Sequence, residues 1–290
     1  MDDLRLYSPN YVKKIIDSYG FKFSKSLGQN FLIDGNIVRN IVEAAGVGPE
    51  DYVLEIGPGI GTLTEELSLR AKEVVSVEID KGLIPILDET LGKYDNIEII
   101  NQDILDVDMD ELIEDKLGAG PVKVVANLPY YVTTPIIARL IEADYNIDSI
   151  TVMVQREIAE RMVAGPGSKT YGSLSVFINY YTQPQIDFIV PASVFMPRPK
   201  VESAVITLKL KKDLIDLDRE KFFEIVKGSF ATRRKTILNS LSNYGYQGME
   251  KSDIRDCLER AGVDPRSRAE QLSIDEFAAI AREFPVIQKG

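Results

Sequence analysis

The sequence predicts an α/β protein with a doubly wound sheet and a small all-helical C-terminal domain. Three observations indicate this fold class. Strand and helix patterns alternate at short intervals between residues 52 and 163, as in a sheet of parallel strands joined by helices. The strand pattern at 122–126 is apolar at nearly every position, which suits a sheet covered on both faces. Beyond residue 213 only helical periodicity remains.

The elements follow in order along the chain. Two amphipathic helices are expected first, at 8–19 and 34–46, and the second has typical capping residues in Asp34-Gly35 and Gly46. Strands are then expected at 52–56, 74–79, 97–100, 122–126, 150–154, 176–181 and 204–210. Helices are expected between them at 62–70, 83–91, 135–141 and 156–163. This order predicts a parallel, doubly wound sheet.

The last part of the chain has a different pattern. Four helical segments without a convincing strand are expected at 222–229, 235–242, 254–261 and 274–282. The change of pattern places a domain boundary near 212–216. We therefore expect one domain over 1–213 and a second over 214–290.

Composition excludes several kinds of chemistry. The 290 residues contain no histidine and one cysteine, so histidine-based triads, histidine bases, zinc sites and iron–sulfur clusters are ruled out. Cys257 lies in an expected helix and is interpreted as a packed thiol. No signal peptide and no apolar run near the roughly 18 residues of a membrane span is found. A cytoplasmic protein is expected, with its chemistry drawn from carboxylates, amides, tyrosines, the backbone and a cofactor.

The basic residues are grouped. A net charge of −11, taken as one number, argues against a nucleic-acid partner. A single basic group is most often a solvated surface, but four groups in expected loops or helix ends indicate a basic face. The candidate RNA contacts are Lys22, Lys25, Arg198, Lys200, Arg233, Arg234, Lys235, Arg266 and Arg268.

The run 124–130 ends a buried strand in Asn-Leu-Pro-Tyr. The side-chain oxygen of Asn127 and the carbonyl of Leu128, held rigid by Pro129, can each accept one N–H bond. The ring of Tyr130 can stack on the base that carries the amine. These groups suit the amino group of a nucleobase. The alternative is a turn that ends the strand and packs a tyrosine.

A second set of residues suits a nucleoside-type donor. Gly57 and Gly59 lie in a glycine-rich turn after the first strong strand, where the backbone can pass close to a ligand. Thr62 stands where a dinucleotide fingerprint needs a third small residue. Glu78 ends the second strand and can accept both hydroxyl hydrogens of a ribose, while Asp103 follows the third and can accept from an adenine amine. Each carboxylate could instead be a helix cap.

These motifs resemble those of the S-adenosylmethionine-dependent rRNA adenine dimethyltransferases, and the resemblance covers almost the whole chain. It rests on the glycine turn, Glu78, Asp103 and the Asn-Leu-Pro-Tyr motif. It extends to the block 25–32 (Lys-Ser-Leu-Gly-Gln-Asn-Phe-Leu) and to the late loop 194–203. The segments 230–236 and 262–270 resemble the helical domain of the family's bacterial small-subunit enzymes. No motif position departs from the family pattern.

The resemblance implies a Rossmann-like methyltransferase domain that binds S-adenosyl-L-methionine, followed by a helical rRNA-binding domain. Asn30 and Leu32 would border the donor. Asn127 and the Leu128 carbonyl would orient the adenine nitrogen toward the methyl group, with Tyr130 stacked on the base. Phe195 would close its other face, unless it is only an apolar anchor of a proline-rich loop. The basic residues would contact phosphates, and no metal is expected.

The implied reaction is N6,N6-dimethylation of two adjacent adenosines in the 3′-terminal hairpin of 16S rRNA, within the assembling small ribosomal subunit. A monomer suffices for it. One alternative is the related resistance methyltransferase that acts on large-subunit rRNA. Another is a non-catalytic assembly or transcription factor, alone or combined with catalysis. A nicotinamide dehydrogenase is disfavoured by Thr62 and by the lack of histidine.

Overall fold

The computed structural model describes residues 5–24, 26–118, 120–142, 145–246 and 249–285. The chain forms two compact units, one of Met1–Ala159 with Gln185–Leu210 and one of Glu160–Pro184 with Lys211–Gly290. The division expected at 213/214 differs from this one mainly in the segment 160–184, which groups with the C-terminal helices.

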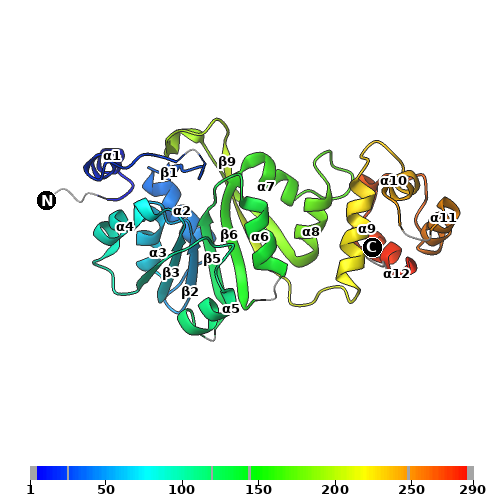
Figure 1. Ribbon diagram of the computed structural model, residues 1–290, viewed down its shortest axis with the longest axis horizontal. Coiled ribbons are helices and arrows are strands. Elements are labelled where there is room, and N and C mark those ends of the chain that lie inside the picture. The colour runs from blue at the N-terminus through cyan, green and yellow to red at the C-terminus, as the bar shows by residue number, and fades with distance from the viewer. Residues whose placement is uncertain (1–4, 25, 119, 143–144, 247–248, 286–290) are drawn as a thin grey trace. The chain divides into compact units, whose positions relative to one another are not determined.

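The first unit is built on a mixed sheet. Its seven strands lie in the order β4-β3-β2-β5-β6-β9-β7 (Figure 1). The parallel part comprises β2 (Tyr52–Ile56), β3 (Glu73–Glu78), β4 (Ile97–Asn101), β5 (Val122–Asn127) and β6 (Ile147–Gln155). The strand β9 (Ser203–Leu210) pairs with β6 in the antiparallel direction. The α/β fold class is confirmed, and its sheet is mostly rather than wholly parallel.

The strand order reverses direction between β2 and β5. From β2 the chain moves outward in one direction through β3 to β4, and from β5 it moves in the other direction to β6. Parallel crossovers of one hand then place helices on opposite faces of the sheet. In such sheets the crevice at the carboxyl ends of the two central strands binds ligands. Here that crevice lies beside Ile56 and Asn127.

Helices α2 (Gly35–Ala44) and α3 (Thr62–Ser68) pack on the sheet. The side chain of Asp34 caps α2 by accepting the backbone N–H groups of Asn36 and Ile37. Apolar residues of both helices share one core cluster with Val53, Val74 and residues further along the sheet. The burial of this amphipathic surface, rather than intrinsic propensity, stabilises the short helices.

A second core cluster joins the N-terminal segment to the rest of the unit. Helix α1 (Pro9–Ser18) packs with α4 (Ile84–Leu91) through buried isoleucine, leucine and valine side chains. Phe31 belongs to this cluster and lies in β1 (Phe31–Leu32). That two-residue strand pairs with β8 (Phe195–Met196), so two segments far apart in the sequence meet. Helices α6 (Thr133–Glu142) and α7 (Arg156–Met162) flank β6 in sequence.

The second unit is helical. Helix α9 (Arg219–Phe230) contacts α8 (Ser173–Tyr181), α10 (Ile237–Tyr244) and α12 (Ile274–Glu283), and α10 contacts α11 (Lys251–Arg260) (Figure 1). An aromatic cluster of Tyr180, Tyr181, Phe222 and Phe223 joins α8 to α9. No helix in the described ranges is long and apolar enough to cross a membrane.

One expectation about the segment 176–190 was wrong, and one strand in it was missed. The expected strand at 176–181 is part of α8, because a short, continuously apolar run does not distinguish a strand from a buried helix. The strand β7 (Thr182–Val190) follows directly and was not expected. It contains Pro184, which normally argues against a strand, but β7 lies at the end of the sheet order, where a missing N–H is tolerated.

Candidate active site

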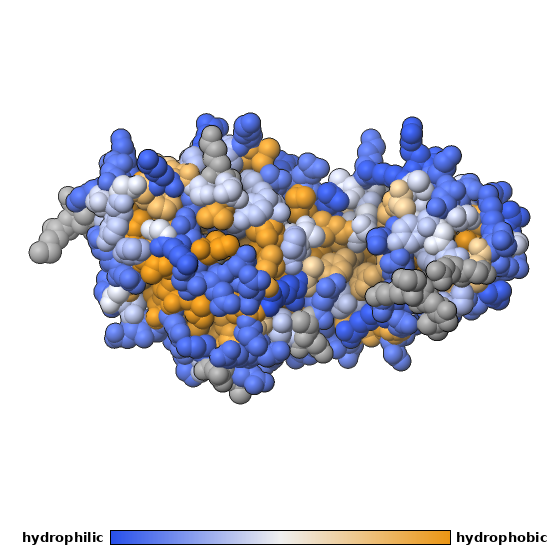
Figure 2. All heavy atoms as spheres, in the orientation of Figure 1, coloured by the Kyte–Doolittle hydropathy of each residue, from blue (hydrophilic) through white to orange (hydrophobic). Residues whose placement is uncertain are grey.

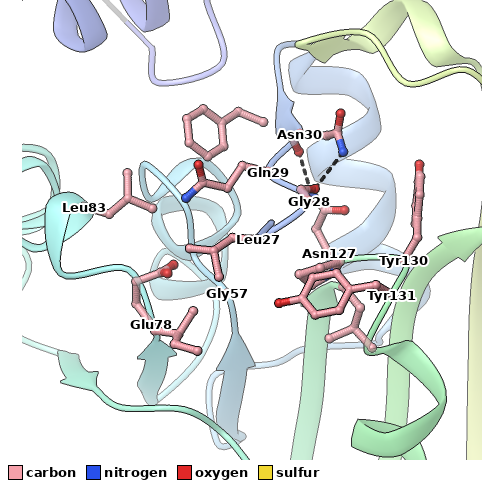
Figure 3. Close-up of a pocket in the computed structure, with 14 residues that line it drawn as sticks. Leu27, Gly28, Gln29, Asn30, Gly57, Glu78, Leu83, Asn127, Tyr130 and Tyr131 are labelled. Carbon is pink, nitrogen blue, oxygen red and sulfur yellow. Dashed lines mark hydrogen bonds between the residues drawn. The ribbon is translucent and has the colours of Figure 1, made fainter. Parts of the chain in front are cut away.

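A cavity opens at the crevice between β2 and β5. Its volume is about 580 Å³ together with the open solvent at its mouth. A smaller hollow of about 290 Å³ shares Phe31, Gly57 and Asn127 with it. Figure 3 shows that the walls come from the N-terminal segment, the turn after β2, the end of β3 and the segment after β5. Seven sequence-predicted residues line the cavity: Asn30, Gly57, Glu78, Asn127, Leu128, Pro129 and Tyr130.

The turn after β2 forms part of the cavity wall through Gly57. Gly57 has a φ of 71° and its N–H donates to the carbonyl of Val77, which fastens the turn to β3. Gly59 has a φ of 62°, and a Cβ there would lie 3.1 Å from the ring of Phe31. Both positions favour glycine because side chains are strained at positive φ. The turn therefore lets another segment, and a ligand, come close to its backbone.

The carboxylate of Glu78 is buried at the end of β3, with 4% of its surface exposed. One of its oxygens accepts the N–H of Gly59 at 3.2 Å and the other accepts the N–H of Asp80 at 2.8 Å. Burial raises the pKa of Glu78 from 4.5 to about 7, although these backbone donors oppose the rise. Glu78 is thus held rigidly at the cavity wall with acceptor capacity left for a ligand hydroxyl.

Asn127 is oriented by the N-terminal segment. Its Nδ2 donates to the carbonyl of Asn30 at 3.0 Å, and Nδ2 of Asn30 donates to the carbonyl of Gly28 at 2.8 Å (Figure 3). Because its nitrogen end is used in this bond, the Asn127 amide presents its oxygen as the acceptor for a further partner. The carbonyl of Pro129 accepts the hydroxyl of Thr133 and the N–H of Val132, so the turn that carries Leu128 is tied to the start of α6.

Tyr130 is anchored at its hydroxyl. The oxygen Oη lies 2.7 Å from Oγ of the buried Ser203 in β9. Burial raises the pKa of Tyr130, which stays a phenol at neutral pH. Its neighbour Tyr131 points in a different direction and lies beside Asn127 in the cavity (Figure 3).

Leu32 and Phe195 are neighbours in the pairing of β1 with β8. Leu32 lines the smaller hollow. Phe195 is 3% exposed and belongs to the core cluster that includes Leu32 and Val205; it is not among the described residues that line either hollow. This placement favours its alternative interpretation as an apolar anchor. A place for it on the second face of a bound base remains a prediction.

Asp103 lies in a turn after β4. Its Oδ1 accepts the N–H of Leu105 at 2.9 Å, and its carbonyl accepts the N–H of Asp106 at 2.9 Å. It does not line either hollow among the described residues. The structure thus shows Asp103 closing a turn rather than capping a helix, and its contact with an adenine amine remains a prediction.

Sequence reasoning missed Glu55, Gln29, Tyr131 and Ser203. Glu55 is a buried carboxylate inside β2, lines the smaller hollow and accepts the hydroxyl of Ser76 at 2.7 Å. Burial raises the pKa of Glu55 to about 7. Gln29 lines the main cavity and donates to the carboxylate of Asp80 at 2.6 Å. The visible signals were an acidic residue within an apolar strand for Glu55, and the family-like segments 25–32 and 194–203 for Gln29 and Ser203.

The basic residues of the helical unit come together. The N–H of Ile237 donates to the carbonyl of Ser267 at 2.7 Å, so the segments 233–237 and 264–268 lie side by side. Arg233 donates to the carbonyl of Lys169, and Arg266 pairs with Asp264 at 3.1 Å. The exposed side chains of Arg234, Lys235 and Arg268 complete this basic patch. Figure 2 shows mainly hydrophilic residues around α10 and α11.

Three of the four basic candidates of the first unit are described. Arg198 and Lys200 are exposed in the loop between β8 and β9, and Lys22 is exposed after α1. Lys25 lies outside the described residues. Contact of these residues with RNA remains a prediction.

Comparison with known proteins gives a consistent result. The family model "Ribosomal RNA adenine dimethylase" matches residues 20–285. The chain is 50% identical over 286 residues to "Ribosomal RNA small subunit methyltransferase A" of Alkaliphilus metalliredigens, covering 98% of this chain and 99% of the relative.

Two solved structures share the fold. A dimethyladenosine transferase from Plasmodium falciparum has a TM-score of 0.71 at 26% identity, covering 86% of this chain and 95% of that one. The 23S rRNA methyltransferase ErmE has a TM-score of 0.66 at 28% identity, covering 87% and 98%. The match to the family model, together with the near full-length relative, shows that this chain belongs to the ribosomal RNA adenine dimethylase family.

Proposed function

We propose that this protein uses S-adenosyl-L-methionine to dimethylate N6 of two adjacent adenosines in the 3′-terminal hairpin of 16S rRNA, in the assembling small ribosomal subunit. The observation that carries the proposal is the orientation of Asn127. Its amide nitrogen is held by the carbonyl of Asn30, so its oxygen remains to accept from an amino group at the cavity. The identity of 50% to a small-subunit methyltransferase supports this choice of subunit.

The residues present fit the proposed donor. The left-handed turn places the backbone of Gly57 at the cavity, and the buried carboxylate of Glu78 can accept ribose hydroxyl hydrogens. Asn30 lines the main cavity, and Leu32 lines the smaller hollow that shares Phe31, Gly57 and Asn127 with it. When bound, S-adenosyl-L-methionine supplies an electrophilic methyl group on a sulfonium.

The protein's own contribution is positional. An exocyclic adenine amine is a poor nucleophile because its lone pair is delocalised into the ring. The oxygen of Asn127 and the carbonyl of Leu128 accept its two N–H bonds, and Tyr130 stacks on the base, so the lone pair is directed at the reacting carbon. The base has to leave its stack or lie in an unpaired loop to reach the cavity. The proton released from the alkylated nitrogen passes to water.

The basic residues of both units would bind the phosphates and set affinity rather than base choice. All residues assigned to the reaction lie on one chain, so we propose that a monomer acts, in the cytoplasm where ribosomal subunits assemble. The basic patch at 233–235 and 266–268 is the proposed rRNA-binding surface of the helical domain.

The test uses small subunits from a strain that lacks this protein. The purified chain and labelled donor are expected to yield N6,N6-dimethyladenosine, detected by mass spectrometry of the nucleosides. Activity on naked large-subunit rRNA alone would instead support the related resistance methyltransferase. NADH binding without affinity for S-adenosylmethionine would revive the dehydrogenase.

The variant Asn127→Ala separates catalysis from scaffolding. It is expected to lower kcat by about 10²–10³-fold, as for other oriented hydrogen-bonding groups, while small-subunit binding is retained. Unchanged turnover would contradict the mechanism. Asn127→Asp is the matched control, because it keeps acceptor oxygens but cannot donate to Asn30.

A further inference from the structure

The ring of Tyr131 is exposed at the cavity beside the Asn-Leu-Pro-Tyr motif. It lines the cavity, yet 60% of its surface is exposed. Large aromatic side chains bury much apolar area when they can, so an exposed ring in a binding cleft has to be accounted for. The proposed mechanism assigns the target base to Tyr130 and leaves Tyr131 without a role.

The two adjacent tyrosines are held in different ways. The hydroxyl of Tyr130 is bonded to Ser203 at 2.7 Å, which fixes that ring toward β9. A Cβ on Gly28 would lie 3.5 Å from the edge of the Tyr131 ring, and Gly28 has a φ of 59°, which favours glycine. The ring of Tyr131 therefore lies beside the backbone of Gly28, which carries no side chain. Figure 3 shows the two rings diverging, with Tyr131 next to Asn127.

An exposed aromatic ring beside a nucleobase site suits a second nucleobase. Every base has a π-face, so stacking accepts any base and needs no hydrogen bond from the ring. In a substrate with two consecutive adenosines, the second base lies one nucleotide from the adenine held by Asn127. We propose that Tyr131 is a second nucleobase platform, which stacks on the base adjacent to the target adenine. This inference rests on the proposed function for the identity of the RNA.

The consequence is that the site binds a dinucleotide better than a single nucleoside. Stacking of one base on an aromatic side chain contributes about 1–3 kcal/mol, which corresponds to a roughly 5- to 150-fold gain in affinity. The stack requires an aromatic ring and does not require the hydroxyl of Tyr131. The platform acts on RNA and leaves binding of the donor unchanged.

The first test measures binding of adenylyl-(3′,5′)-adenosine and of adenosine, by calorimetry or NMR titration. Wild-type protein is expected to bind the dinucleotide roughly 5- to 150-fold more tightly. Tyr131→Leu, which keeps an apolar side chain beside Gly28, should abolish that difference, and Tyr131→Phe should retain it. Equal affinities of the wild type for the two probes, or a difference retained in Tyr131→Leu, would overturn the proposal.

The second test measures methyl transfer to undermethylated small subunits. Tyr131→Leu is expected to raise KM for the subunits with Kd for the donor unchanged, and Tyr131→Phe should match the wild type. Tyr19→Ala is the control, because Tyr19 is 40% exposed outside the cavity. A defect in Tyr131→Phe equal to that in Tyr131→Leu would overturn the platform. An inactive wild type would instead refute the proposed function, while the dinucleotide test still decides the role of Tyr131.

Discussion

The hydroxyl of Tyr130 and the hydroxyl of Ser203 lie 2.7 Å apart, although 73 residues separate them in the sequence. Ser203 is fully buried at the start of β9, which pairs with β6 beside the strand that carries Asn127. This bond ties the ring proposed to stack on the target adenine to the antiparallel part of the sheet. The strand β9 therefore holds the ring of Tyr130, which lies just after the end of β5.

Ser203→Ala should lower kcat and leave Kd for the donor unchanged. The substitution leaves the Tyr130 hydroxyl without its partner in a half-buried site, which costs about 1–3 kcal/mol, and frees the ring to turn. Tyr130→Phe should cause a similar loss, and the double variant should be no worse than either one, because both remove one interaction. Full additivity of the two losses would contradict the coupling.

Thr207→Val is the matched control for that experiment. Thr207 lies on the same strand, but its hydroxyl donates to Asp187 at 2.8 Å and faces Thr151. Its loss should lower the free energy of unfolding without altering kcat. A fall in kcat as large as that of Ser203→Ala would mean that β9 acts through stability alone.

Much of the site could be predicted because it lies where strands end. The apolar runs of β2, β3 and β5 stop at Ile56, Glu78 and Asn127, and right-handed crossovers bring these ends to one edge of the sheet. The end of a strand can be predicted from the sequence within a few residues of it. The helices of the second unit can likewise be predicted from their local apolar periodicity.

The rest depends on contacts that carry no local signal. The meeting of Leu32 with Phe195 and of Tyr130 with Ser203 joins segments that no periodicity relates. The direction of the Tyr130 ring depends on its bond to that distant serine. Helix α8 was mistaken for a strand because a short apolar run is compatible with either a strand or a buried helix. Its packing against α9, which favours the helix, cannot be read from the local sequence.

Affinity for the donor should increase as pH rises from 6 to 8. Burial raises the pKa of Glu78 to about 7, and the ionised carboxylate accepts both ribose hydroxyl hydrogens where the acid accepts less well. Kd by calorimetry is expected to fall across this interval, and Glu78→Gln should remove most of the dependence. Glu55, whose pKa is also raised to about 7, can account for the remainder. A Kd that rises with pH in the wild type would contradict this assignment.

The same carboxylate should make the protein less stable at high pH. Its folded pKa lies above the unfolded value of 4.5, so its contribution is fully present below pH 4.5 and is lost as pH rises through 7. The loss is at most about 3 kcal/mol. Urea unfolding at pH 5.5 and 8 should show a smaller decline for Glu78→Gln than for the wild type. An equal decline would place the titration elsewhere.

Gly59→Ala should lower the thermal stability of the fold more than Gly57→Ala. Both positions have positive φ, which costs a side chain about 1–2 kcal/mol. Only at Gly59 would the new Cβ also meet the Phe31 ring, at 3.1 Å, whereas nothing lies within 4 Å at Gly57. Thermal unfolding checks the order. Gly165→Ala, which has neither feature, should resemble the wild type.

Arg234→Ala should weaken small-subunit binding more than Arg266→Ala. The two side chains are exposed on neighbouring segments of the basic patch, but Arg266 is paired with Asp264 at 3.1 Å and already partly neutralised. Loss of a cation that contacts a phosphate lowers the salt slope of the binding constant by about 1. Binding measured at several salt concentrations should show this change for Arg234→Ala, with the donor Kd unaffected. A salt slope unchanged in Arg234→Ala would remove the patch from the rRNA-binding surface, since an exposed cation in contact with RNA has to release counterions when it binds.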